Sequence, residues 1–591
     1  MKSIKLFWLA LKWNNFDYDT ICEKWLQCWY IIDNECSTKE VYDFLCSIDI
    51  NISTTFYKTW KDITSRSRLD LYIDQVAHYI TTYGSSHTGE PYIVNDKFWE
   101  KLDVDFKKFK IIKSSTKKEI ILKCDHMLQS WIALNEETIE DIFTIFSSFE
   151  YMPNIDLVKN KEAKMQIHFS LGTIPKDNVE FLRFLIYIAT KKSLIIKDYK
   201  TINTIIASDT DISDKVKQFW EKKLSEIFLR FKPIFLAFKK SNINNRPIIN
   251  RLRKLAITEH KPYNSWFFET LLSDLSKVYT LPEKIKELNN FKKISLLEAI
   301  KNRCNPWKYS SYIIRNGKFF LKENISDNKE KISTYKLMEW IIYNSLIQEV
   351  WKHKWKKFYM PEYLDIKAPK SEKTFIGNIP MWTEIQLPNN DLILGINWRE
   401  EDGANDFDLS FTNIDWGRLW WNAQFNDTQN DVTYSWDMTS ASPEATELFY
   451  FWGNAVDWLL KNNKYHWVER SLFTFFIAKE NIQWQIKQNH MVKKENILFQ
   501  TKLVSIDREQ ILGIKTWDKF IIQNIISWNK QLSSWDDITT AYIKYTIQNQ
   551  DNLVSLRKIM LDAWLIECEN NNDVDYDFSD IKKDDIINIL S

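Results

Sequence analysis

Residues 393–447 decide the fold class, and they read ILGINWREEDGANDFDLSFTNIDWGRLWWNAQFNDTQNDVTYSWDMTSASPEATE. Short apolar runs alternate here with polar turn clusters, which is the pattern of successive short strands. The same period of two continues from about residue 381 to about residue 530, so we expect an antiparallel β-sandwich there. The predicted strands are Leu392–Asn397, Phe407–Thr412, Leu419–Phe425, Val432–Tyr434, Thr446–Phe451, Leu472–Ala478, Asn496–Ser505 and Lys519–Ile526, and a short helix is expected at Asn454–Lys464.

Helical periodicity dominates the chain on both sides of this region. Apolar residues recur at a period near 3.6 in residues 1–150 and again in 151–370, where Asn316-Gly317 predicts a β-hairpin over 312–323. Residues 531–591 return to helix and become acidic. The chain is therefore expected to be a multidomain α + β protein, with a large and mostly α-helical N-terminal part, the sandwich at 381–530, and a short helical, acidic C-terminal segment.

Composition limits the class of protein. A chain of 591 residues is too long for one core and suggests about three or four domains. A net charge of +1 provides no global field toward nucleic acid or membrane, and the apolar runs are broken before the ~20 residues of a membrane helix. The seven cysteines match no zinc or disulfide pattern, and the N-terminal apolar patch lacks a cleavage site, so we expect a cytoplasmic protein.

Glycine and tryptophan are present in unusual numbers. The chain has 10 glycines and 27 tryptophans, whereas average usage would give about 41 glycines. Trp416, Trp436 and Trp535 all stand in turn-like sequences, where a side chain gains nothing and a Cβ is unfavourable. Two explanations are open: the gene is read with UGA as glycine, or an AT-rich genome has produced a real aromatic bias.

The most basic stretch runs from Arg230 to Lys261, and its cations suggest a phosphate- or RNA-contacting face. The candidate nucleic-acid-binding residues are Lys239, Lys240, Arg246, Arg251, Arg253 and Lys254. Pro233 and Pro247 are expected to begin two helices. Phe231, Phe235 and Phe238 either stack bases or form an apolar core stripe.

Acidic turns in the sandwich suggest a metal site. Asp406 and Asp408 point to the same face of a strand because side chains alternate, and Asp437 lies in a separate turn. Calcium prefers several such oxygen ligands, although turn carboxylates are also common on solvated surfaces.

A family resemblance appears at the same residues. The order of motifs is Gly395-x-x-Trp398, Asp406-Phe-Asp408-Leu-Ser410, Asn413-x-Asp415 and Val432-x-Tyr434-Ser435-Trp436-Asp437-Met438-Thr439. Over residues 385–515 this order resembles the TerD family of tellurium-resistance and stress proteins. The resemblance implies a calcium-binding β-sandwich with Asp406, Asp408 and Asp437 as ligands. Trp436 stands where that family has glycine, and Met438 replaces an asparagine.

Three classes of function remain open from the sequence. The first is a non-enzymatic binding or scaffold protein of a stress-response or defence type, with protein partners and calcium as its cofactor. The second is an RNA-associated protein that uses the basic helices at 230–261. The third is an enzyme of unknown class, although the chain contains no P-loop, GxGxxG, HExxH or Ser-His-Asp pattern and no small-molecule substrate is identified.

Overall fold

The computed structural model shows an α + β chain in two compact units. Residues 116–281 form one unit, and residues 3–115 together with 282–590 form the other. The structure describes residues 2–12, 30–33, 35–46, 53–54, 110–258, 267–304, 309–313, 319–323, 331–388, 391–398, 406–413, 418–419, 426–427, 431–435, 445–452, 457–464, 471–479, 490–492, 496–505, 509–526, 537–571 and 573–591. The sequence-based divisions at 150 and 370 differ from this arrangement, because the N-terminal segment belongs to the same unit as the sandwich.

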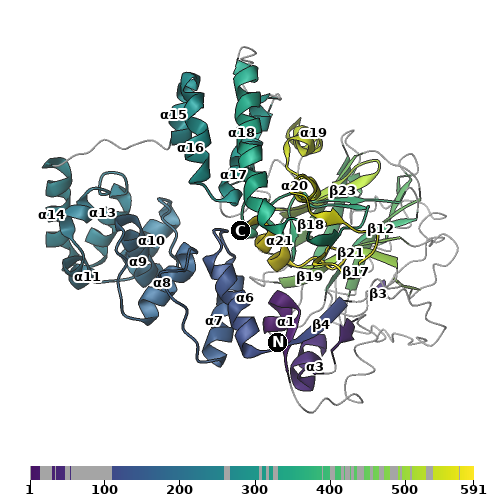
Figure 1. The fold of residues 1–591 in the computed structure, drawn as a ribbon, viewed down its shortest axis with the longest axis horizontal. Coiled ribbons are helices and arrows are strands. Elements are labelled where there is room, and N and C mark those ends of the chain that lie inside the picture. The colour runs from purple at the N-terminus through teal and green to yellow at the C-terminus, as the bar shows by residue number, and fades with distance from the viewer. Residues whose placement is uncertain are drawn as a thin grey trace, which may run out of the picture. The chain divides into compact units, whose positions relative to one another are not determined.

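The unit of residues 116–281 is helical (Figure 1). Its elements are α6 (Lys117–Gln129), α7 (Glu136–Ser148), α8 (Lys161–Ser170), α9 (Asn178–Thr190), α10 (Tyr199–Ala207), α11 (Ser213–Gln218), α12 (Glu221–Ser225), α13 (Lys232–Ser241), α14 (Asn245–Thr258), α15 (Phe267–Ser273) and the 3-10 helix η2 (Leu275–Thr280). Several helices begin at polar caps, and Thr116 and Glu119 form a reciprocal capping box at the start of α6. Pro233 and Pro247 lie in the first turns of α13 and α14, as predicted.

The other unit begins with a small parallel sheet that the sequence did not reveal. Its N-terminal elements are α1 (Lys2–Phe7), β1 (Leu9–Leu11), β2 (Tyr30–Ile32), α3 (Thr38–Cys46), β3 (Ser53–Thr54) and β4 (Lys110–Ser115). β4 lies between β1 and β2, and Leu9 pairs with Lys113. The expectation of an all-helical start was therefore wrong here, since a strand that pairs across about a hundred residues leaves no local periodicity.

A pair of helices with a β-hairpin between them precedes the sandwich. It contains α16 (Leu281–Lys286), α17 (Asn290–Cys304), the strands β5 (Tyr309–Ile313) and β6 (Phe319–Glu323), α18 (Ile332–Val350), the 3-10 helix η4 (Trp351–His353) and β7 (Lys357–Tyr359). β5 and β6 pair antiparallel, which confirms the predicted hairpin, while its turn lies outside the described residues. α18 ends at Val350, and η4 and β7 follow it directly.

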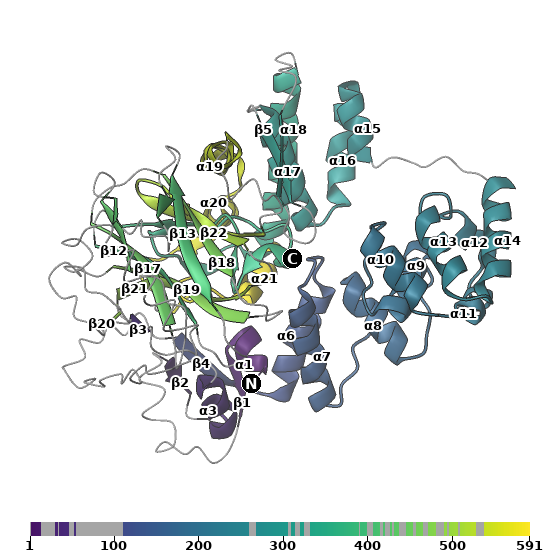
Figure 2. The same ribbon diagram turned by 180° about the vertical axis from the view of Figure 1, so that it is seen from behind.

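Two antiparallel sheets form the sandwich, as predicted (Figure 2). The first has the order β14-β13-β18-β22-β23-β11-β8 and the second has the order β15-β16-β17-β12-β19-β21. The elements are β8 (Leu364–Asp365), the 3-10 helix η5 (Glu372–Thr374), β9 (Phe375–Ile376), β10 (Ile379–Pro380), β11 (Glu384–Gln386), β12 (Leu392–Trp398), β13 (Phe407–Asn413), β14 (Arg418–Leu419), β15 (Asn426–Asp427), β16 (Val432–Tyr434), β17 (Ala445–Phe451), β18 (Trp458–Lys464), β19 (Ser471–Lys479), β20 (His490–Met491), β21 (Ile497–Ser505), β22 (Glu509–Lys515) and β23 (Lys519–Ile526).

Aromatic side chains join the two sheets. Phe411 of β13 meets Phe449 of β17 edge to face at 4.3 Å between ring centroids, and Phe407 contacts Trp398 at 5.6 Å. The helix expected at 454–464 was wrong, because Trp458–Lys464 forms the strand β18 between β13 and β22.

The C-terminal segment returns to helix and adds two short strands to β7. Its elements are α19 (Asp537–Asn549), the 3-10 helix η7 (Gln550–Asn552), α20 (Leu556–Asp562), β24 (Ile566–Glu567), β25 (Tyr576–Asp577) and α21 (Lys583–Leu590). β24 and β25 both pair parallel with β7. The acidic tail is therefore part of the folded unit.

Candidate anion-binding pocket

The structure places two of the three predicted calcium ligands and leaves the third untested. Asp406 and Asp408 are 4% and 2% exposed, at the start of β13, and the Asp437 prediction lies outside the described residues. Nearby, the buried Glu447 accepts hydrogen bonds from the Leu409 N–H (2.7 Å) and from the Tyr434 hydroxyl. Among the described residues, no three acidic, histidine or cysteine side chains are grouped so that they could hold a metal ion. Calcium binding stays a prediction.

The predicted nucleic-acid-binding residues lie on α13 and α14. Lys239 is half-buried and donates to Asn250 (2.8 Å), whereas Lys240, Arg246, Arg253 and Lys254 are exposed. Arg251 is exposed too, and it pairs with Glu221 at 3.0 Å.

The aromatic residues beside these cations belong to the core. Phe231, Phe235 and Phe238 are 8%, 0% and 0% exposed and lie in the apolar cluster of α8–α14. Of the two alternatives, base stacking or an apolar core stripe, these phenylalanines therefore form the core stripe. Only the cations on the surface of these helices are open to a ligand.

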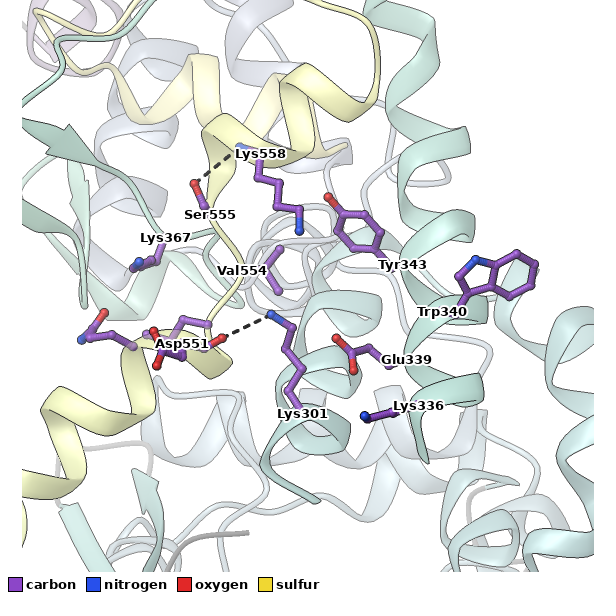
Figure 3. Close-up of a pocket in the computed structure, with 12 residues that line it drawn as sticks. Lys301, Lys336, Glu339, Trp340, Tyr343, Lys367, Asp551, Val554, Ser555 and Lys558 are labelled. Atoms are coloured by element: carbon purple, nitrogen blue, oxygen red, sulfur yellow. Dashed lines mark hydrogen bonds between the residues drawn. The ribbon is translucent and has the colours of Figure 1, made fainter. Parts of the chain in front are cut away.

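A second cluster of cations lies in the other unit, and sequence reasoning missed it. A hollow of about 450 Å³ lies among α17, α18, Lys367 and the segment from η7 to α20 (Figure 3). Its lining residues are Lys301, Lys336, Glu339, Trp340, Tyr343, Lys367, Gln550, Asp551, Leu553, Val554, Ser555 and Lys558. We call this hollow the lysine pocket.

Helix periodicity brings the α18 residues to the pocket. Lys336, Glu339 and Tyr343 are spaced three and four residues apart, so they lie on one face of the helix. The other face buries Met338, Ile342 and Leu346, which fixes the orientation of α18. The pocket face of this helix is consequently polar.

The floor of the pocket is a network of hydrogen bonds. Lys367 is buried and paired with Asp365 (2.5 Å) and Glu384 (3.0 Å). Burial alone would lower the pKa of Lys367, but the two carboxylates raise it above the usual lysine value. Ser555 donates to Asp365 (2.7 Å) and accepts from the Lys558 N–H (3.4 Å) as the cap of α20. The polar groups of Lys367 and Ser555 are thus already engaged in contacts within the protein.

The remaining three lysines are available to a ligand. Lys301, Lys336 and Lys558 form no direct ion pair within the part of the chain that the structure describes. Figure 3 shows Lys301 and Lys558 pointing toward each other across the hollow, and Lys301 donates to the Asp551 carbonyl at 3.4 Å. Burial lowers the pKa of Lys301, Glu339 opposes this shift, and Lys558 adds to it by a smaller amount. The hollow therefore brings three ammonium groups together with the carboxylates of Glu339 and Asp551.

A cysteine lies close to these lysines. Cys304 lies at the end of α17, where burial first and the Glu339 carboxylate second raise the pKa of its thiol to about 11. A thiol with that pKa stays protonated near neutral pH and is a weak nucleophile. The arrangement is suited to holding an anion by charge and hydrogen bonds.

Comparison with known proteins gives no family for this chain. No family model, no curated protein and no solved structure matches it. The TerD resemblance accordingly stays a prediction. In the described residues, no helix has the length and apolar character needed to cross a bilayer.

Proposed function

We propose that this protein is a non-enzymatic binding protein whose lysine pocket takes a small anion with several negative charges, such as a phosphate ester or a diphosphate. The observation that carries the proposal is that Lys301, Lys336 and Lys558 line one half-open hollow and that, in the part of the chain that the structure describes, none of the three forms a direct ion pair. The volume of about 450 Å³ falls within the range of small-ligand sites.

Electrostatics supports an anionic ligand. Two ammonium groups that face each other in a partly buried site repel; burial is the main cause of the lowered pKa of Lys301, Glu339 opposes it, and Lys558 contributes a smaller lowering. Glu339 and Asp551 line the same hollow and offset two of the three lysines that form no ion pair within the described residues, whereas Lys367 is already paired with Asp365 and Glu384. A multiply charged anion would relieve the repulsion and accept several ammonium hydrogen bonds at once.

Two nucleophilic side chains at or beside the hollow are already engaged. Ser555 is occupied as the cap of α20, and burial holds Cys304 as a thiol. These two observations support a binding role.

Calorimetric titration of the full chain with inorganic pyrophosphate tests the proposal. We expect binding that weakens at least about tenfold in Lys301→Met and in Lys558→Met, since each loses a charge-assisted hydrogen bond worth about 1.5–3 kcal/mol. Glu339→Gln is expected to tighten binding, because it removes a repulsive carboxylate. Lys240→Met, on α13, is the matched control and should change nothing.

The pH dependence of the same titration provides a second readout. Lys301 must be protonated to attract the anion, so affinity should fall as pH rises through its lowered pKa. That decline should begin at lower pH than for an ordinary lysine and should be absent in Lys301→Met. Equal affinity in wild type and both lysine variants would overturn the proposal.

RNA association through α14 is the second candidate. The observation that favours it is the exposure of Arg246, Arg253 and Lys254 along one helix. Because the nearby phenylalanines are buried, such a surface would contact phosphates and would show little base preference. A salt-dependent shift of labelled RNA that survives Arg246→Ala and Arg253→Ala together would contradict it.

A further inference from the structure

Four tryptophans occupy backbone conformations that normally belong to glycine. They are Trp8 (φ 58°), Trp355 (φ 70°), Trp382 (φ 77°) and Trp564 (φ 67°). Of the ten described non-glycine residues with positive φ, four are tryptophan and four are aspartate. Aspartate tolerates this region because its short side chain bonds locally, whereas a bulky aromatic residue is an outlier there. Tryptophan is thus enriched where it is least expected.

Trp564 stands at the glycine position of a helix end. α20 ends at Asp562, Ala563 is the cap, and Trp564 is the next residue, in the left-handed region. The Leu565 N–H donates to the Met560 carbonyl (3.0 Å), and the Trp564 N–H donates to the Leu561 carbonyl (3.0 Å). These two bonds define the Schellman motif, whose left-handed residue is usually glycine.

Trp355 and Trp382 stand at the glycine position of turns. In the first turn, Lys354 has φ −48° and ψ 135°, Trp355 follows with positive φ, and the Lys356 N–H donates to the His353 carbonyl (3.1 Å). That geometry is a type II turn, whose third residue is normally glycine.

The second turn has the same hydrogen bond. The Thr383 N–H donates to the Pro380 carbonyl (3.3 Å), and Trp382, the third residue of that turn, has positive φ. The fourth tryptophan, Trp8, is the residue directly after the end of α1. All four positions lie at chain reversals or helix ends.

Packing of the indoles does not explain Trp355 and Trp564. They are 59% and 56% exposed, and they touch each other edge to face at 5.8 Å, with Lys354 over both rings. An exposed aromatic pair could also be a docking surface for another protein. That reading accounts for the rings but not for the turn and helix-end backbones beneath them, nor for Trp382 and Trp8.

We infer that the native polypeptide carries glycine at positions 8, 355, 382 and 564, and that the gene encodes these positions with UGA codons read as glycine. The composition agrees with this inference, because 10 glycines and 27 tryptophans together approach the ~41 glycines of an average chain of this length. The inference is independent of the lysine pocket.

The codons of the gene test the inference directly. We expect a UGA codon at all four positions. We also expect glycine at each position when the protein is isolated from the organism that carries the gene and its peptides are sequenced by mass spectrometry. A UGG codon at any of the four positions would overturn the inference.

The melting temperature of the full chain, expressed with tryptophan at these positions, gives a second test. Trp564→Gly and Trp355→Gly should each raise the melting temperature by about 2 °C, since glycine relieves the left-handed strain. Trp340→Gly is the matched control, because Trp340 is 65% exposed within α18. Glycine inside a helix is unfavourable, so this variant should melt lower. The inference fails if Trp564→Gly and Trp340→Gly lower the melting temperature alike.

Discussion

The helices α8–α14 and the β-sandwich bury different kinds of side chain. The helical core is an apolar cluster that includes Phe228 and Phe235, and every lysine and arginine of those helices stays at least partly exposed. The sandwich encloses charge as well, since Glu447 and Lys515 are 0% and 2% exposed. Helix periodicity separates apolar from charged faces, whereas the strands of the sandwich bury some charged side chains together with apolar ones.

The buried charges of the sandwich are compensated in different ways. Glu447 accepts hydrogen bonds from Leu409 and Tyr434, so its carboxylate is satisfied. Lys515 lies 4.8 Å from the centroid of the Phe451 ring and donates to the Thr516 carbonyl at 3.2 Å. Burial lowers the pKa of Lys515 to about 8 even though Asp457 and Asp518 oppose the shift. The sandwich should therefore respond to pH through Lys515.

The largest effect is expected in the apolar core. Phe235 is fully buried and stacks on Phe228 at 5.0 Å between ring centroids, so Phe235→Ala should cost about 3–5 kcal/mol. Hydrogen exchange of peptides from residues 116–281 measures this loss of local stability. Lys240→Ala, on the exposed face of the same helix, should stay within about 0.5 kcal/mol, and equal losses would show that the core assignment is wrong.

The next effect is the pH dependence of the sandwich. The folded-state pKa of Lys515, about 8, lies below its unfolded value, so the folded state binds fewer protons between the two values. Stability should rise from pH 8 toward pH 10.5 by at most about 3 kcal/mol. Melting temperatures across this range should show the rise in wild type and a smaller one in Lys515→Met, which should also be the more stable of the two at pH 7. Parallel curves would contradict the prediction.

Glu447→Ala should have a smaller effect, about 2 kcal/mol, because it leaves the Leu409 N–H and the Tyr434 hydroxyl without their acceptor. Tyr434→Phe removes the hydroxyl donor itself, so this donor is not left without an acceptor. The variant should therefore lose less free energy of unfolding. Chemical unfolding followed by circular dichroism ranks the two variants. The reverse order would mean that Glu447 is tolerated rather than required.

The smallest effect is expected at the helical surface. Arg251 pairs with Glu221 at 3.0 Å, but the two side chains are 56% and 28% exposed. Exposed ion pairs contribute about 0–1 kcal/mol, so Arg251→Ala should change unfolding by no more than that. A larger loss in hydrogen exchange near α12 and α14 would show that this surface stabilises the unit more than its exposure suggests.

Much of the fold could be predicted from local pattern. The strands predicted at Leu392–Asn397 and Phe407–Thr412 match β12 and β13 to within a residue. The sequence predicts a helix where β18 lies and no strand where β22 lies, because their buried polar residues, such as Lys461 and Gln510, break the alternation that identifies a strand. Their neighbours in the sheet, not their own pattern, determine their state.

The lysine pocket could not be predicted in the same way. Lys301 and Lys558 are separated by more than half of the sandwich unit's sequence, and neither belongs to a run of charge. The basic run that did stand out in the sequence, Arg230–Lys261, is mainly an apolar helix pair with a solvated face. Charge density along the chain is a poor guide to charge density in space.

The sequence by itself determined the α + β class, the β-hairpin before the sandwich and the scarcity of glycine, because each depends on local pattern or composition. Tertiary structure decided which lysines are paired, which phenylalanines are core, and which tryptophans stand at left-handed turns. Burial and backbone dihedral angles depend on partners distant in the chain, and Trp564 shows this most clearly, since only its helix end reveals a position suited to glycine.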